Sequence, residues 1–325
     1  MQNTEQLPTT LDRWSTLPNI KRVSLHEWHA AQCPECGMRS STDGDRLMIR
    51  DDPPRAWCRN CRALFWPDQD ELDEEEIKAR REIYMWEMEI ADAALAKDIA
   101  KRRTQLQSSG TWLNMHDAAV TNQEAMLIWK WALFGDRDMD PMPIVSRYSL
   151  GWLDQYMSTT VKSPALSIPF WGPRNTLLTI QYRLLEHDGD KYRFQAGLPS
   201  TMFLTRPDDF GESESAIVVE GAKKAMVVAL FMPEWDVIGM PSKTMPLKLL
   251  KALSGFNSAY FALDPDAHVS ELGKESAVER AVRESMAKKN FIVDVPAKPD
   301  DFFTMYGGTK RDMEEIIKNA RRIGR

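Results

Sequence analysis

The chain has 325 residues, of which 43% are hydrophobic and 28% are charged, a balance typical of folded globular domains and not of a disordered chain. This length corresponds to roughly two to three modules. The formal net charge of −6 argues against a uniformly basic coat for nucleic acid, so any such contact has to be local.

Residues 1–25 are polar and interrupted by prolines, and they predict a loosely ordered leader. The first residues, MQNTEQLPTT, lack the basic and apolar regions of an export signal. No stretch reaches the roughly 20 uninterrupted apolar residues of a membrane-spanning helix. We therefore expect no membrane association and a cytoplasmic location.

Residues 26–69 contain all four cysteines, and we interpret them as a zinc ribbon. Cys33 and Cys36 form one C-x₂-C pair, and Cys58 and Cys61 form a second. Four thiolates would fill the tetrahedral shell of one structural Zn²⁺. The ribbon is also rich in arginine and aromatic residues, namely Arg39, Arg46, Arg50, Arg55, Trp57, Arg59, Arg62, Phe65 and Trp66. Such a surface can bind phosphates and stack bases, while a structural or protein-docking role stays open.

The next two segments predict a linker and a mixed subdomain. Residues 70–110 are rich in charged residues and alanine, with apolar residues at near-helical spacing, and predict a long charged helical linker. Residues 111–215 combine a predicted helix over 124–134 with predicted strands over 165–170 and 177–185. This combination indicates an α+β subdomain.

Residues 216–325 alternate short apolar runs with helical segments, which is typical of a mainly parallel sheet buried on both faces. The predicted strands are 216–220, 236–239, 259–264 and 291–295. The predicted helices are 222–231, 247–253 and 271–289, and a basic amphipathic helix follows from residue 310. The sequence thus predicts a multidomain protein of α+β and α/β class.

Acidic residues follow two of these predicted strands. Glu220 ends the first strand, directly before Gly221, and ligands of open α/β sheets collect at such carboxyl ends. Asp264 and Asp266 follow the third strand. If the backbone stays extended through Pro265, both aspartates point the same way and can hold one or two hard cations.

These motifs resemble a known family. E-G-A-K-K-A at 220–225 and L-D-P-D at 263–266 resemble the Toprim fold of primases, topoisomerases and some nucleases. The resemblance implies that Glu220, Asp264 and Asp266 bind catalytic Mg²⁺ or Mn²⁺. It extends to residues 298–301, where Asp300 is retained as a further magnesium ligand and Lys298 replaces the first acid.

The order of zinc ribbon, α+β subdomain and Toprim domain is similar to that of bacterial and phage-type primases. The segments 147–152, 167–174, 181–183, 191–192 and 203–206 also resemble primase motifs. The resemblance implies a groove for single-stranded DNA template, RNA primer and incoming NTP. Its basic residues would be Arg147, Arg183, Lys191, Lys223 and Arg206.

The resemblance implies a DNA primase that synthesises short RNA primers in a bacterial or phage-infected cell. The sequence contains no G-x-x-x-x-G-K-[ST] motif, so a replicative helicase would act in trans. Two alternatives stay open: a Toprim-type metal-dependent nuclease, and a degenerate primase that binds a replisome. The ribbon and the α+β subdomain favour the primase.

Overall fold

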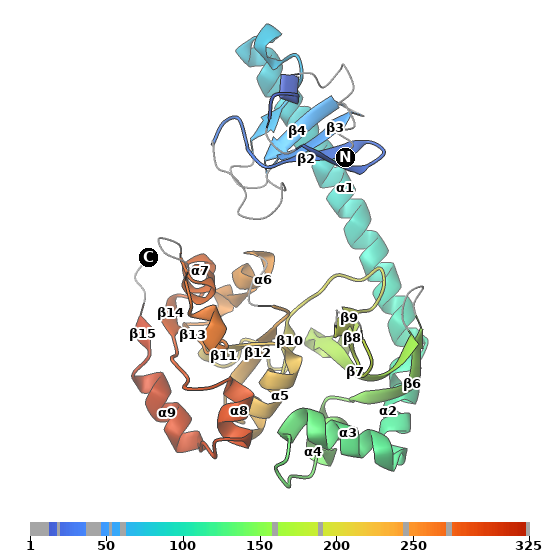
Figure 1. The fold of residues 1–325 in the computed structure, drawn as a ribbon, viewed down its shortest axis with the longest axis vertical. Helices are drawn as coiled ribbons and strands as arrows, with labels where there is room; N and C mark the ends of the chain where they lie inside the picture. Colours follow the sequence, from blue (N-terminus) through green and yellow to red (C-terminus); the bar gives the residue numbers. More distant parts are fainter. Residues whose placement is uncertain are drawn as a thin grey trace, which may run out of the picture. The chain divides into compact units, whose positions relative to one another are not determined.

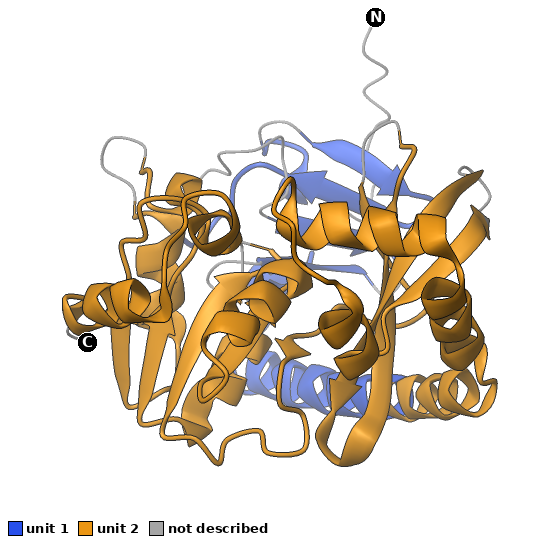
Figure 2. Cartoon of the chain, turned by 90° about the horizontal axis from the view of Figure 1, so that it is seen from below, with its two compact units in different colours: residues 1–95 blue, residues 96–325 orange. Residues whose placement is uncertain are grey.

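The computed structural model describes residues 13–17, 20–36, 47–51, 54–58, 63–157, 162–187, 191–242, 247–270 and 275–322. The chain divides into two compact units, residues 1–95 and 96–325 (Figure 2). The division falls within the helix α1 (Glu74–Ser108). The presence of α1 confirms the long helix expected in the charged segment. None of the helices in the described ranges is long and apolar enough to cross a membrane.

Unit 1 contains a small antiparallel sheet in which the strands follow one another in sequence order. Its strands are β1 (Lys21–Ser24), β2 (Glu27–Ala30), β3 (Leu47–Asp51), β4 (Pro54–Cys58) and β5 (Leu64–Phe65), and the short helix η2 (Gln69–Glu71) precedes α1. The core includes Trp14, Trp28 and the buried Cys33 and Cys58. Part of the segment expected to be a loose leader therefore belongs to this folded ribbon.

The first part of unit 2 is a helical layer on an antiparallel sheet (Figure 1). The helices are α2 (Thr111–Thr121), α3 (Gln123–Phe134) and α4 (Met142–Arg147). The sheet has the order β6 (Gly151–Met157), β7 (Lys162–Gly172), β8 (Thr176–Leu184) and β9 (Tyr192–Phe194), with η3 (Pro173–Asn175) between β7 and β8. The expected α+β character of this segment is confirmed.

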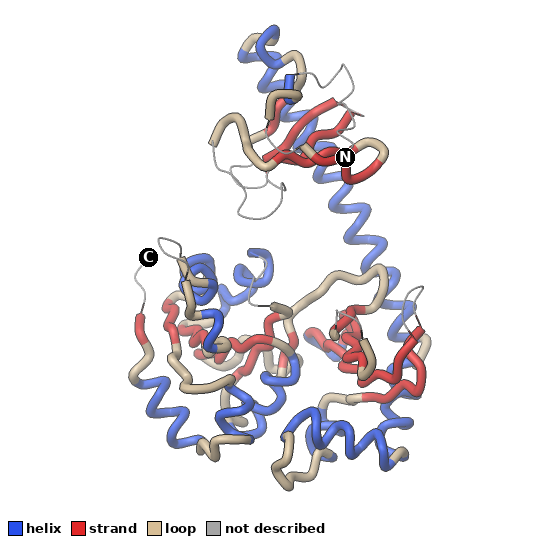
Figure 3. Tube along the Cα trace, viewed as in Figure 1, coloured by secondary structure: helices blue, strands red, loops and turns tan. Residues whose placement is uncertain are grey.

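The second part of unit 2 contains a six-stranded sheet (Figure 3). Its order is β10 (Phe203–Leu204), β12 (Asp236–Met240), β11 (Ser215–Glu220), β13 (Ser258–Phe261), β14 (Lys289–Ile292) and β15 (Arg321–Arg322). The four central strands are parallel, and both edge strands are antiparallel to their neighbours. The predicted, mainly parallel sheet is therefore present.

Helices cover both faces of this sheet (Figure 1). The helices are α5 (Ala222–Phe231), α6 (Leu247–Lys251), α7 (Ala277–Glu284), α8 (Pro299–Thr304) and α9 (Lys310–Lys318), with short turns η4 (Ala252–Gly255) and η5 (Pro265–Ala267). In β11, Ile217 and Val219 join the core under α5, whereas Ala216 and Val218 join the core under α7. This burial on both faces explains the continuous apolar run of β11.

One predicted helix is shorter than expected. Residues 271–289 predict a single helix, but α7 spans only Ala277–Glu284, and residues 271–274 lie outside the described ranges. Ser276 begins α7 through a capping box with Glu279, and Ser285 turns extended at its end. Lys289 already belongs to β14. The prediction was wrong here because serine capping and sheet pairing override the helix propensity of this segment.

Candidate active site

A tight turn places Glu220 at the carboxyl end of β11. Gly221 has a φ of +83° and begins the passage into α5. Its N–H donates to the carbonyl oxygen of Met240 at 2.6 Å. A Cβ on Gly239 would lie 2.7 Å from the carbonyl oxygen of Gly221, so only glycine fits at position 239 beside this turn. The half-buried Glu220 is therefore fixed where two parallel strands end.

Asp264 and Asp266 lie in different surroundings, although they are two residues apart. Asp264 is extended and 7% exposed, whereas residues 265–267 form the 3₁₀ turn η5. The N–H of Ala267 donates to the carbonyl oxygen of Asp264 at 2.9 Å, which closes this turn. Asp266 is exposed. The condition under which both aspartates would point the same way, an extended backbone through Pro265, is not met, because a proline at the first turn position favours the turn.

Two consecutive lysines at the start of α5 pair with two buried carboxylates. Lys223 Nζ lies 2.5 Å from Oδ2 of Asp300 in α8, and Lys224 Nζ lies 3.0 Å from Oδ2 of Asp264. Burial alone lowers the pKa of Lys224, but the surrounding carboxylates outweigh it and leave the pKa above its ordinary value. In order of effect, these carboxylates are Asp264, Asp300 and Glu220. Three acids expected from the sequence thus surround one lysine.

Cations from both parts of unit 2 gather beside these acids. Burial lowers the pKa of Lys191 below its ordinary value, and nearby cations lower it further. Those cations are Arg183, Lys223 and Lys298. Arg183 is 7% exposed, and its guanidinium lies 5.5 Å from the ring centroid of Trp131. A positive cluster next to carboxylates can bind a polyphosphate together with a divalent cation.

Arg147 and Arg206 lie in a different part of unit 2. Both line a cavity of about 500 Å³. Arg206 pairs with Asp209 at 3.1 Å. Burial raises the pKa of Asp236, at the amino end of β12, and Arg206 partly offsets this rise. The structure thus brings Arg183, Lys191 and Lys223 together with the acids, but it places Arg147 and Arg206 elsewhere.

Two of the predicted metal-ligating carboxylates have an oxygen without a hydrogen-bond partner. In the part of the chain that the structure describes, Oδ1 of Asp264 and Oδ1 of Asp300 are buried without a hydrogen-bond partner. Leaving a buried acceptor unpaired is costly, and carboxylate oxygens are the ligands that hard cations prefer. Among groups of three or more His, Cys, Asp or Glu residues in the same ranges, only a set of cysteines has its ligand atoms all within 4.8 Å of one another. Each of these two aspartates is instead paired with a lysine.

That cysteine set consists of Cys33, Cys36 and Cys58 in unit 1. Their sulfurs lie within 4.8 Å of one another, and Sγ of Cys36 lies 4.0 Å from Sγ of Cys58. Cys61, the fourth predicted ligand, lies outside the described residues. Three clustered thiols, two of them buried, fit a structural Zn²⁺.

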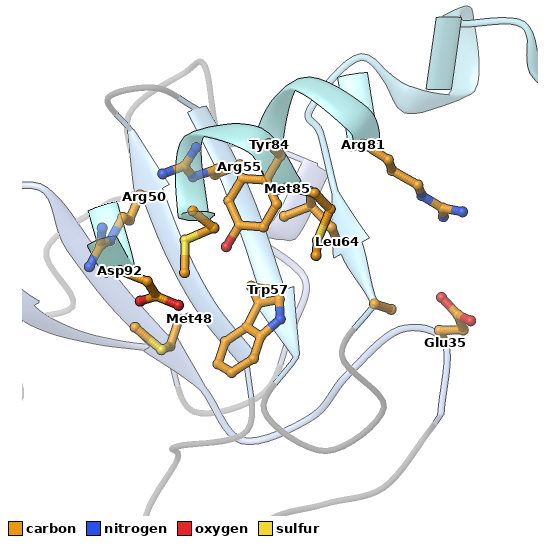
Figure 4. Close-up of a pocket in the computed structure, with 12 residues that line it drawn as sticks. Glu35, Met48, Arg50, Arg55, Trp57, Leu64, Arg81, Tyr84, Met85 and Asp92 are labelled. Atoms are coloured by element: carbon orange, nitrogen blue, oxygen red, sulfur yellow. The ribbon is translucent and has the colours of Figure 1, made fainter. Parts of the chain in front are cut away.

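Unit 1 also contains a cavity of about 820 Å³ beside α1 (Figure 4). Arg50, Arg55, Arg81, Trp57 and Tyr84 line it together with methionines. The Arg55 guanidinium lies 4.8 Å from the ring centroid of Tyr84. Four further arginines of the predicted surface lie outside the described residues, namely Arg39, Arg46, Arg59 and Arg62. Arginine beside aromatic rings is a composition that suits single-stranded nucleic acid.

No protein-family model and no curated protein matches this sequence. The fold, however, is similar to solved primase structures. A structure of the Aquifex aeolicus primase, with its zinc-binding and RNA polymerase domains, aligns over 97% of this chain and 83% of its own, at 14% identity and a TM-score of 0.51. The E. coli primase catalytic core aligns over 66% of this chain and 79% of its own, at 14% identity and a TM-score of 0.50.

A third structure, a DnaG primase catalytic domain bound to single-stranded DNA, aligns over 68% of this chain and 80% of its own, at 13% identity and a TM-score of 0.50. The protein therefore has the fold of the zinc-binding and RNA polymerase domains of bacterial primases. The resemblance to bacterial and phage-type primases is confirmed at the level of the fold.

Sequence reasoning missed two contributors to the acidic site. The motif at 220–225 contains Lys224 but does not indicate its ion pair with Asp264. Trp131 belongs to the predicted helix over 124–134, and in the structure its ring contacts the guanidinium of Arg183. Neither contact leaves a local signal, because the partners are about 40 and 52 residues away along the chain.

Proposed function

We propose that this protein is a DNA primase that synthesises short RNA primers on a single-stranded DNA template. The observation that carries the proposal is the acidic and basic cluster of unit 2 within a primase-like fold. In this proposal residues 216–325 form a Toprim-type domain.

Glu220, Asp264, Asp266 and Asp300 would hold Mg²⁺ or Mn²⁺. When bound, the ion would neutralise phosphate charge and activate the primer 3′-hydroxyl. Lys191, Arg183 and Lys223 would bind and orient the triphosphate of the incoming NTP, because cations donate charge-assisted hydrogen bonds to phosphate oxygens. Partial desolvation and the neighbouring cations lower the pKa of Lys191, although this residue is exposed, and an anionic triphosphate would relieve the repulsion among the cations.

In unit 1, Cys33, Cys36, Cys58 and Cys61 would hold one structural Zn²⁺. The metal would stabilise a ribbon too small to fold on its own. The cavity lined by Trp57, Tyr84 and three arginines would contact the template. A replicative helicase acting in trans belongs to the same proposal.

The test is incorporation of labelled NTP on mixed-sequence single-stranded DNA with Mg²⁺ or Mn²⁺. We expect template-dependent short RNA from the wild type and at least a roughly 100-fold loss in Asp264→Asn. Asp138→Asn is the matched control, since the Asp138 side chain is 98% exposed and its ion pair is with Lys130, away from the acidic cluster. Asp264-dependent degradation of the template would replace the primase with a Toprim-type nuclease, and the absence of any product would refute the polymerase activity of the chain.

A further inference from the structure

The part of α1 that belongs to unit 1, residues 74–95, exposes large apolar side chains to solvent. No residue of α1 is buried. Ile83, Trp86 and Ile90 are 57%, 62% and 50% exposed. Single exposed apolar residues are ordinary on a protein surface, whereas a contiguous group of them marks an interaction site. Tryptophan is also enriched among the residues that dominate the binding energy of interfaces.

The opposite side of α1 packs on the ribbon. The Arg55 guanidinium lies 4.8 Å from the ring centroid of Tyr84, and Tyr84 also lines the cavity of about 820 Å³ (Figure 4). Arg80 donates to both carboxylate oxygens of Asp68, at 2.8 and 2.9 Å. Consecutive helix residues project about 100° apart. Trp86 therefore lies about 160° around the helix from Tyr84 and faces away from the ribbon.

The exposed apolar residues follow the spacing of a coiled-coil seam. Steps of four and three residues alternate along this side of α1, which keeps the side chains in one line. We call this line the apolar stripe, and its members are Ala79, Ile83, Trp86, Ile90 and Ala93. At the usual rise of a helix the stripe is about 21 Å long. It therefore offers about four helical turns to a partner.

Glutamates border one edge of the apolar stripe. Glu75, Glu82 and Glu89 recur at intervals of seven residues, and the last two directly precede Ile83 and Ile90. All three glutamates are exposed, and none forms an ion pair with a described residue. In a pair of helices, residues at this position face the edge of the partner helix and decide which partner is accepted.

The same charges exclude a second copy of α1 as the occupant. In a parallel pair, Glu82 of one copy would face Glu87 of the other. In an antiparallel pair, the glutamate edge of one copy would face the glutamate edge of the other. Like charges across an interface suppress pairing. The apolar stripe therefore selects a helix whose edges are basic.

We propose that the apolar stripe docks an amphipathic helix of another protein, with apolar residues at heptad spacing and lysine or arginine along its edges. Trp86 packs between apolar side chains of that helix, while Glu82 and Glu89 pair with its cations. Because isolated helices of so few turns are marginal in water, the docked helix belongs to a folded partner. The inference goes beyond the proposed activity, since no residue of the stripe is assigned to metal, nucleotide or template.

The experiment uses the full chain and two fluorescein-labelled peptides of three heptads. Both peptides carry leucine along the seam; one carries lysine at the edges and the other glutamate, so that neither pairs with itself. Binding is followed by fluorescence anisotropy at physiological salt. We expect the lysine peptide to bind at least about tenfold more tightly than the glutamate peptide. Hydrogen exchange should show added protection of residues 79–93 when the lysine peptide is bound.

Two variants test the apolar and the charged part of the stripe separately. Trp86→Gln should bind the lysine peptide at least about tenfold more weakly. The double variant Glu82→Lys with Glu89→Lys should prefer the glutamate peptide. Leu127→Gln and Glu315→Lys are the matched controls, since Leu127 of α3 is 60% exposed and the side chain of Glu315 on α9 is 60% exposed. Both controls should bind like the wild type.

Several results would overturn the proposal. They are the absence of binding by either peptide, added protection that lies outside residues 79–93, and wild-type binding by Trp86→Gln or by the double variant with an unchanged far-ultraviolet circular dichroism spectrum. A further one is a dimer of the chain in sedimentation that Trp86→Gln dissociates, because it would assign the stripe to a second copy. A failed primer-synthesis assay leaves the result unchanged.

Discussion

Replacing Lys224 by methionine tests whether its ion pair with Asp264 stabilises unit 2. The pair is 3.0 Å long, and its side chains are only 16% and 10% exposed. Methionine keeps the apolar stem and has a helix propensity close to that of lysine. The substitution therefore removes the charge and leaves Asp264 as a buried carboxylate without its cation.

The magnitude follows from burial. Removing one partner of a buried ion pair costs about 3–5 kcal/mol, and the remaining exposure favours the lower end, about 3 kcal/mol. For a unit the size of residues 96–325, each 1 kcal/mol shifts the melting temperature by about 2–4 °C. We expect Lys224→Met to melt about 6–12 °C below the wild type at pH 7.

Thermal unfolding of the full chain, followed by near-ultraviolet circular dichroism, measures this shift. Lys130→Met is the matched control, since Lys130 pairs with an Asp138 side chain that is 98% exposed, and such a pair contributes about 0–1 kcal/mol. Millimolar Mg²⁺ should raise the melting temperature of Lys224→Met more than that of the wild type. The reasoning is refuted if Lys224→Met melts no lower than Lys130→Met.

Three further predictions concern metals and pH. In a titration followed by electron paramagnetic resonance, Mn²⁺ should bind at least about tenfold more tightly when NTP is present, and Mn²⁺ should raise the affinity for NTP by the same factor. Equal Mn²⁺ affinities with and without NTP would contradict a site that metal and NTP share. Cys36→Ser or zinc chelation should unfold the ribbon of unit 1, seen as lost protection of β3 and β4 in hydrogen exchange, and unchanged protection would exclude a structural metal. Burial raises the pKa of Asp236 in the folded protein. The favourable contribution of this carboxyl group to folding stability is therefore complete below its pKa in the unfolded chain and is lost as the pH rises through its pKa in the folded protein. In urea unfolding, Asp236→Asn should gain stability relative to the wild type between pH 4.5 and pH 7, and a constant difference in stability would count against the raised pKa.

Much of the parallel sheet could be predicted from the sequence because its signals are local. The apolar run ending in Glu220, followed by Gly221, marks a strand, a turn and a helix start within a few residues. Burial on both faces requires such a run, and the structure has β11 and α5 at this place. The place of Glu220 at a strand end follows from the same pattern.

The internal arrangement of the acidic site could not be predicted in the same way. Asp264 and Asp266 share one motif, yet the 3₁₀ turn at 265–267 leaves one buried and the other exposed. The pairing of each lysine depends on elements far along the chain, which spacing alone does not encode. The assignment of Arg147 and Arg206 to a cavity of their own depends on strand register, and register is a property of the assembled sheet.

Under the proposed function, the two adjacent lysines would let the acidic site serve two kinds of ligand. Consecutive helix residues project about 100° apart, so Lys223 reaches Asp300 in α8 while Lys224 reaches Asp264 after β13. Each ammonium therefore neutralises a carboxylate that a divalent cation would also bind. Under the proposed function, a cation that takes over these carboxylates would release the ammonium groups, and the released groups would then bind phosphate oxygens. Metal and nucleotide would exchange partners with the lysines, and neither would have to add its whole charge to the site, which is the physical reason to expect that they bind together.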